Sequence, residues 1–173
     1  IKADFAFHGS ETENKRLFDK ELGGGALFDI GVYPLFLSYL LLGNPKEIFA
    51  SAIKHKNDID LQTSMILQYE SAQSVLHASI VSDSDMKAVI AGTEGRIEFN
   101  APWFVADGYS LFKNEQEAVF SFPTLGKGYS HEIVECQNYI LNNEIESKLW
   151  SHQNSLDLSR IVEEIKKQIN LPF

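Results

Sequence analysis

The apolar residues of this chain follow two different periods, and each period predicts its own kind of element. A period of two, in which successive side chains face opposite sides of a strand, begins at residues 1–8 and returns through the middle of the chain. The strands that it predicts are 1–8, 48–54, 61–69, 74–81, 89–91, 96–99, 109–113 and 118–122. Because a parallel crossover needs about a dozen residues and most of these connections are shorter, we expect a mainly antiparallel sheet.

Three further segments carry the helical period. The first, 26–42, follows three glycines and ends before Gly43-Asn44-Pro45, which is typical of a helix stop. The other two, 130–142 and 151–169, place apolar residues three and four apart, as amphipathic helices do. The sequence therefore predicts one α+β domain over residues 1–173, with helices packed on one face of an open, mainly antiparallel β-sheet.

The predicted sheet has a second face that these helices would leave uncovered. In the segment 74–81, alternate residues from Leu76 to Ile80 share one side and those from Val75 to Val81 share the other, so both sides are fairly apolar. We expect the uncovered face to contact a second copy of the protein or another domain, which makes a homo-oligomer the predicted assembly.

Charge and composition exclude several classes of function. Fifteen basic against twenty-four acidic residues give a net charge of −9, with no basic cluster longer than Lys166-Lys167, so a nucleic-acid surface is not expected. The longest apolar run without an ionisable side chain, 30–43, is shorter than the ~20 residues of a membrane span. The single Cys136 excludes an internal disulfide and suits the reducing cytoplasm, which is the localisation that we expect.

The beginning of the chain and its histidines add two expectations. Ile1-Lys2-Ala3-Asp4 resembles the middle of a protein rather than a signal peptide, so we expect the chain to be part of a longer polypeptide. The five histidines include no pair four residues apart and no close cysteine partner, so no metal site is predicted.

Asp29 is the only ionisable carboxylate in the helical segment 26–42. Apolar residues surround the rest of that helix almost completely, and a helix of this kind is expected to be buried on every side. A buried carboxylate without partners costs several kcal/mol, so Asp29 is expected to have partners. The first turn of a helix provides some of them, because its free N–H groups favour a negative charge.

Other residues near Asp29 make this segment a candidate site. Tyr33 lies four residues on, on the same helix face, and Pro34 should bend the helix there because proline lacks an N–H. Gly24 and Gly25 would allow a backbone or a ligand to approach closely. Spacing alone leaves two interpretations open: a helix-start acid with a core tyrosine and turn glycines, or a site where a carboxylate, a phenol and bare backbone converge.

The string Gly-Gly-Gly-Ala-Leu-Phe-Asp-Ile-Gly-Val-Tyr-Pro at 23–34 resembles the signature of the GFO/IDH/MocA oxidoreductases, and most of all the branch that contains dimeric dihydrodiol dehydrogenase. Weaker matches at 16–19, 92–97, 128–133 and 146–147 follow in the order of that branch. The resemblance implies a two-domain protein whose N-terminal Rossmann domain binds NAD or NADP. This chain would be the second domain alone, because it contains no Gly-x-Gly-x-x-Gly fingerprint, and alone it is expected to be inactive.

The resemblance also implies a reaction and roles for residues. Hydride would pass between nicotinamide and a CH–OH group of a sugar, polyol or diol. Tyr33 takes the place of the family's acid/base residue, Asp29 orients the substrate hydroxyl, and Arg16 lies in a loop near the nicotinamide side of the cleft. Many relatives carry histidine where Tyr33 stands, so a lysine of the other domain is an alternative proton carrier. A different class of function, a non-catalytic sugar-binding or dimerisation module of the same fold, remains the alternative.

Overall fold

The structure is a computed structural model that describes residues 1–122, 126 and 128–172. Within these ranges, eight strands form one sheet: β1 (Lys2–Ala6), β2 (Glu47–Lys54), β3 (Asp60–Gln68), β4 (Gln73–Ser79), β5 (Ala88–Gly92), β6 (Gly95–Phe99), β7 (Gly108–Lys113) and β8 (Gln116–Ser121). The α-helices are α1 (Val32–Leu42), α2 (Tyr129–Leu141) and α3 (His152–Gln168). Each predicted strand has a counterpart whose ends differ by no more than two residues.

The strand order in the sheet is β2-β3-β4-β1-β5-β6-β7-β8. Every neighbouring pair is antiparallel except β1 and β4, which run parallel in the register Lys2 to Val75. The prediction of an open, mainly antiparallel sheet is confirmed. The parallel pair agrees with the rule on connections, because the chain between β1 and β4 is long enough to contain α1 and two strands.

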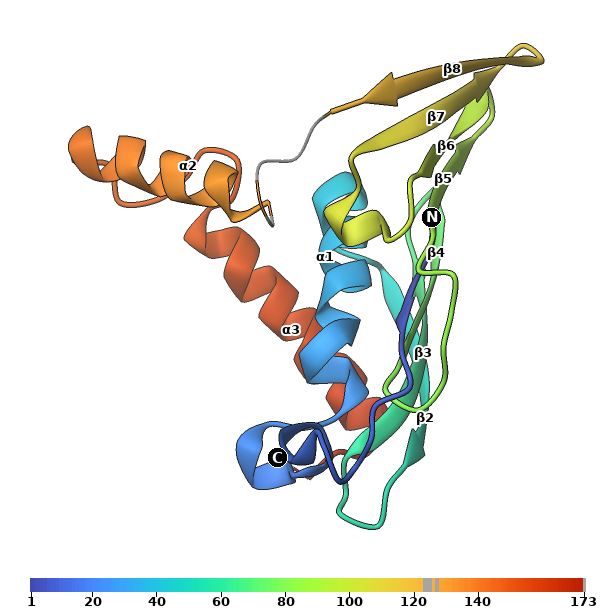
Figure 1. Ribbon diagram of the computed structural model, residues 1–173, viewed down its shortest axis with the longest axis vertical. Coiled ribbons are helices and arrows are strands. Elements are labelled where there is room, and N and C mark those ends of the chain that lie inside the picture. The colour runs from blue at the N-terminus through green and yellow to red at the C-terminus, as the bar shows by residue number, and fades with distance from the viewer. Residues whose placement is uncertain (123–125, 127, 173) are drawn as a thin grey trace.

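The main core lies between the sheet and the helices α1 and α3, which cover one face (Figure 1). Its central side chains come from α1, α3 and the strands β3 and β4, and all are at most 1% exposed: Leu35, Met65, Leu67, Leu76 and Ile165. This layer confirms the prediction of helices on one face of the sheet. Helix α2 projects away from that layer and has no buried residue.

The first helix is less buried than the sequence predicted. Leu35 is fully buried against the sheet, but Tyr33, Phe36 and Leu40 on other sides of α1 are 43%, 40% and 51% exposed. The expectation of burial on every side is therefore wrong for this chain. The physical reason is that, among the described residues, the sheet and α3 cover only part of α1, so the apolar side chains on its remaining sides meet solvent.

By length and composition alone, the 23-residue segment Lys20–Leu42 is apolar enough to cross a membrane. The run without ionisable side chains, 30–43, is shorter and did not indicate this. The structure gives this apolarity another cause. Within this segment, 56% of the most apolar 18-residue stretch is buried inside the protein. Leu27 and Leu35 lie in the core beneath the sheet. The segment therefore has the composition of a core helix.

The opposite face of the sheet carries a row of side chains in register. Phe49 pairs with Ile66, Ile66 with Val75, and Val75 with Lys2. The three apolar members of this row are exposed, Phe49 at 56% and Val75 at 48%. An apolar row of this kind at the surface is typical of a contact area.

Candidate active site

The site begins at a 3₁₀ turn, η1 (Lys15–Phe18), which backbone hydrogen bonds attach to the start of the first helix. Gly25 N–H donates to the Leu17 carbonyl at 2.9 Å, and Gly24 N–H donates to the Asp19 carbonyl at 2.9 Å. A Cβ at Gly24 would lie 2.6 Å from the carbonyl oxygens of Arg16 and Leu17. Glycine is therefore required here because the chain approaches its own backbone this closely.

Asp60 fixes the same helix start from the sheet. It is fully buried at the beginning of β3, and its Oδ2 accepts hydrogen bonds from Leu27 N–H at 2.7 Å and from the Thr63 hydroxyl at 2.5 Å. Gly25 has a φ of +109°, and a Cβ there would collide with Asp60 Oδ1. Burial raises the pKa of the Asp60 carboxyl above its ordinary value, while the hydrogen bonds from Thr63 and the Leu27 backbone act in the opposite direction.

A π-helical turn, η3 (Leu27–Gly31), precedes α1. The sequence predicted one helix over 26–42 with a bend at Pro34, whereas the irregular turn lies just N-terminal to that proline. Pro34 has no N–H to direct at the Ile30 carbonyl, so a regular α-helical ladder would be interrupted at this point in any case. Single π turns inside helices are frequent at functional sites.

Asp29 lies within the π turn, and its carboxylate forms an ion pair with the Arg16 guanidinium. The Asp29 side chain is 20% exposed and that of Arg16 is 55% exposed. The expectation that Asp29 has a partner is confirmed. Sequence reasoning singled out both residues but did not foresee that they pair, because thirteen positions separate them along the chain.

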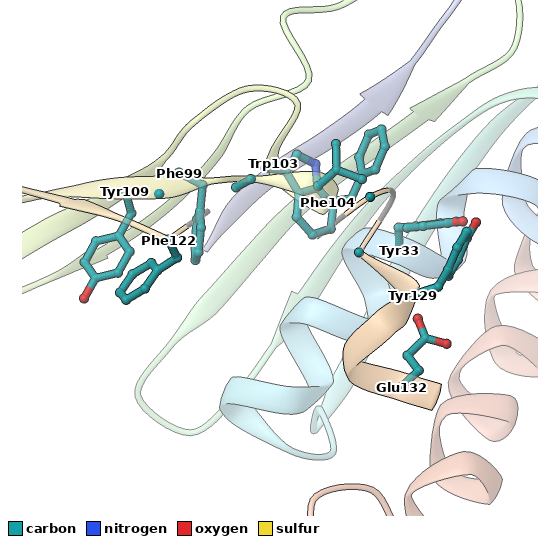
Figure 2. Close-up of a pocket in the computed structure, with 13 residues that line it drawn as sticks. Tyr33, Phe99, Trp103, Phe104, Tyr109, Phe122, Tyr129 and Glu132 are labelled. Carbon is teal, nitrogen blue, oxygen red and sulfur yellow. The ribbon is translucent and has the colours of Figure 1, made fainter. Parts of the chain in front are cut away.

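Tyr33 stands at the first turn of α1, beside the stacked rings of Phe5 and Phe104, whose centroids are 4.0 Å apart. The ring centroids of Phe5 and Phe104 lie 5.3 and 5.6 Å away, both in edge-on geometry. Tyr33 lines a cleft of about 870 Å³ whose aromatic wall includes Phe99, Trp103, Phe104, Tyr109 and Phe122 (Figure 2).

Tyr129 and Glu132, from the beginning of α2, lie at the Tyr33 end of this cleft. The sequence carries a weak signal for both, the family match at 128–133, but neither was predicted as a site residue, and for Glu132 a capping role was preferred to that of a pocket acid. Of the five predicted site residues, Tyr33 alone lines the cleft among the described parts of the chain. Arg16 and Asp29 meet in their ion pair, and the convergence of all five on a ligand remains a prediction.

The glycines offer no cradle for a dinucleotide. The N–H groups of Gly24 and Gly25 already donate to the Asp19 and Leu17 carbonyls, and the positions that their Cβ atoms would take are filled by Arg16, Leu17 and Asp60. A pyrophosphate needs free N–H groups and open backbone at a helix start. In the structure, Gly24 and Gly25 allow the loop, the helix start and β3 to pack closely together. That they also lie near a substrate or cofactor stays a prediction.

Comparison with known proteins shows that the fold and the signature belong to one family. A family model for the GFO/IDH/MocA C-terminal domain matches residues 1–98. The chain belongs to the GFO/IDH/MocA family. It is 31% identical over 91% of its length to trans-1,2-dihydrobenzene-1,2-diol dehydrogenase of Xenopus tropicalis, and 30% identical over 90% to scyllo-inositol 2-dehydrogenase (NADP(+)) IolU of Bacillus subtilis. These matches confirm the resemblance seen in the sequence.

Solved structures show the same fold. A 3-ketoreductase from Actinomadura kijaniata, in complex with NADP and TDP-benzene, matches 97% of the chain with a TM-score of 0.82 at 20% identity. An aldose-aldose oxidoreductase from Caulobacter crescentus, complexed with glycerol, matches 98% with a TM-score of 0.81 at 18% identity. The chain spans 53% and 52% of these structures and about half of the two curated relatives named above. It is the C-terminal half of this fold.

Proposed function

We propose that the full-length protein is an NAD(P)-dependent oxidoreductase acting on a CH–OH group of a sugar, polyol or diol, and that this chain supplies the substrate side of its active site. The observation that carries the proposal is the helix start that holds Asp29 in an ion pair with Arg16 and, one turn on, exposes the Tyr33 phenol at a cleft. The names of the relatives support it, since they are dehydrogenases of a cyclic diol and of an inositol.

The cofactor is NAD or NADP, bound mainly by the other half of the protein. The filled glycine turn of this chain supports that division, and the NADP in a relative's name and in a similar structure supports the cofactor class. When bound, nicotinamide supplies hydride chemistry. This chain contributes the groups that hold the substrate and move its proton.

In this scheme Tyr33 Oη takes the proton of the substrate hydroxyl during oxidation and returns it during reduction. A tyrosine has an ordinary pKa of ~10, so transfer near neutral pH needs a cation beside the phenol, and a lysine of the other half is our candidate. The Asp29 carboxylate, held in place by Arg16, accepts a hydrogen bond from a substrate hydroxyl and so orients the reacting carbon.

Replacement of Tyr33 by phenylalanine tests this function. Because Tyr33→Phe keeps the ring that packs against Phe5 and Phe104, stability should change little. Turnover in the full-length protein should fall by about 10²-fold, the ordinary contribution of a positioned acid or base. Tyr139→Phe is the control, since it removes a phenol that lies outside the cleft lining, where it accepts a hydrogen bond from Lys148 N–H. Equal turnover in the two variants would contradict the role of Tyr33.

We also propose that the protein is a homo-oligomer in the cytoplasm. The exposed row formed by Phe49, Ile66 and Val75 supports assembly through the uncovered face of the sheet. Cys136 is a free, exposed cysteine, which suits a reducing compartment.

A further inference from the structure

A buried carboxylate outside the proposed catalytic residues lies where two functional segments meet. Asp60, the first residue of β3, has no exposed surface, and one of its oxygens accepts hydrogen bonds from both Leu27 and Thr63. Leu27 is the first residue of the π turn, two positions before Asp29. Asp60 therefore holds the sheet to the start of the element that carries the proposed site.

The other oxygen of Asp60, Oδ1, contacts the end of the loop that carries Arg16. It lies against Gly25, so closely that a Cβ at that position would collide with it. Gly25 N–H donates to the carbonyl of Leu17, the neighbour of Arg16 in η1. Gly25 O in turn accepts from Asp29 N–H at 3.3 Å. Asp60 is thus connected through Gly25 and Leu27 to the segments that carry both partners of the Arg16–Asp29 ion pair.

We propose that Asp60 is a positioning residue of the active site, which fixes the loop and the helix start relative to each other and so sets the geometry of the Arg16–Asp29 pair. The inference rests on the proposed function, because it assigns that pair to the substrate. Asp60 itself does not line the cleft among the described residues, so its action passes through Arg16 and Asp29.

The presence of a carboxyl group at position 60, inside the core, supports the inference. A carboxylate in a core is costly, and well-packed apolar residues often give equal or greater stability in such positions. Burial raises the pKa of Asp60, so part of this cost remains in spite of its hydrogen bonds. What the acid provides is directional: its acceptor oxygen fixes the position of the Leu27 N–H, which an apolar side chain cannot do.

A double-mutant cycle on the full-length enzyme tests the inference. We expect Asp60→Ala and Arg16→Met each to lower kcat by about 10-fold, and the double variant to lower it by about 10-fold also, rather than about 100-fold, because both changes disable one unit. KM for the cofactor should remain unchanged in all three. If Asp60→Ala does not fold, Asp60→Leu, which has a branched side chain without an acceptor oxygen for the Leu27 N–H, takes its place in the cycle, and the same non-additivity is required.

One control variant and two outcomes separate the possible failures. Ser74→Ala removes a different buried polar group, a hydroxyl that hydrogen-bonds to Ser38 of α1 at 2.7 Å, and it should lower stability while keeping kcat. Independent effects of Asp60 and Arg16, multiplying to about 100-fold, would overturn the positioning role. Full turnover in Asp29→Asn and Arg16→Met would instead show that the proposed site is wrong, and the role of Asp60 would be overturned with it.

Discussion

The three consecutive glycines before the helix occupy different environments, which predicts different costs for the same substitution. Gly23 has a φ of +68° with open space around it, so Gly23→Ala meets only the cost of a left-handed alanine, about 1 kcal/mol. At Gly24 a Cβ would lie 2.6 Å from two backbone oxygens, which have to move with the whole loop. We expect Gly24→Ala to cost about 3 kcal/mol, the upper range for overpacking.

Gly25 combines both penalties. Its φ of +109° is strained for any residue with a Cβ, at about 1–3 kcal/mol, and the new methyl group would collide with Asp60. We expect Gly25→Ala to cost about 4 kcal/mol in total, with overpacking against a fixed side chain as the second contribution. The loss of stability should therefore rise in the order Gly23, Gly24, Gly25.

Urea denaturation of the three alanine variants measures this order through their unfolding midpoints. Gly23→Ala serves as the internal control, since it changes the same residue type in the same turn without a collision. Equal midpoints for all three variants, or the lowest midpoint for Gly23→Ala, would refute the close approach of loop, helix and Asp60 described here. The measurement also separates the structural role of the glycines from any role at a ligand.

Two further predictions concern Asp60 and the uncovered sheet face. Burial raises the pKa of Asp60 above its ordinary 3.8, so the folded protein holds this proton more tightly than the unfolded chain, and the stability linked to it falls as pH rises from 3.8 through the raised value. Asp60→Asn should remove this slope, and melting curves of both proteins from about pH 4 to 7 will test it; parallel curves would contradict the burial of the carboxyl. Phe49→Glu combined with Val75→Glu places charges in the exposed apolar row and should convert an oligomer to monomers in sedimentation experiments, whereas an unchanged oligomer would place the interface elsewhere.

Much of the fold was predictable because it follows from local periodicity. Alternation located the strands, and helical spacing located α2 and α3, since each pattern reports which side chains face a common layer. The place of β1 beside β4 was not predictable in this way, because a period of two gives no information about the strand's partner. The exposed sides of α1 were missed because a helix that is apolar all round predicts burial on every side, whereas Tyr33, Phe36 and Leu40 are exposed.

The site was predictable only as far as its residues lie in one string. Asp29, Tyr33 and the glycines stand together in sequence, and the family signature marks them. The pairing of Asp29 with Arg16 depends on how the loop folds back, which no local pattern encodes. Asp60 was missed because the predicted strand began one residue later, at Leu61, so that the acid was left outside the strand although it begins β3.

A structure of the full-length protein with NAD(P) and a bound polyol or diol would show whether Tyr33 and Asp29 meet the substrate. We predict that the reacting hydroxyl lies within about 2.6–3.2 Å of Tyr33 Oη, and that Asp29 contacts the same ligand while still paired with Arg16. A productive ligand whose reacting hydroxyl lies more than about 6 Å from Tyr33 Oη would contradict it, because a proton cannot pass directly over that distance.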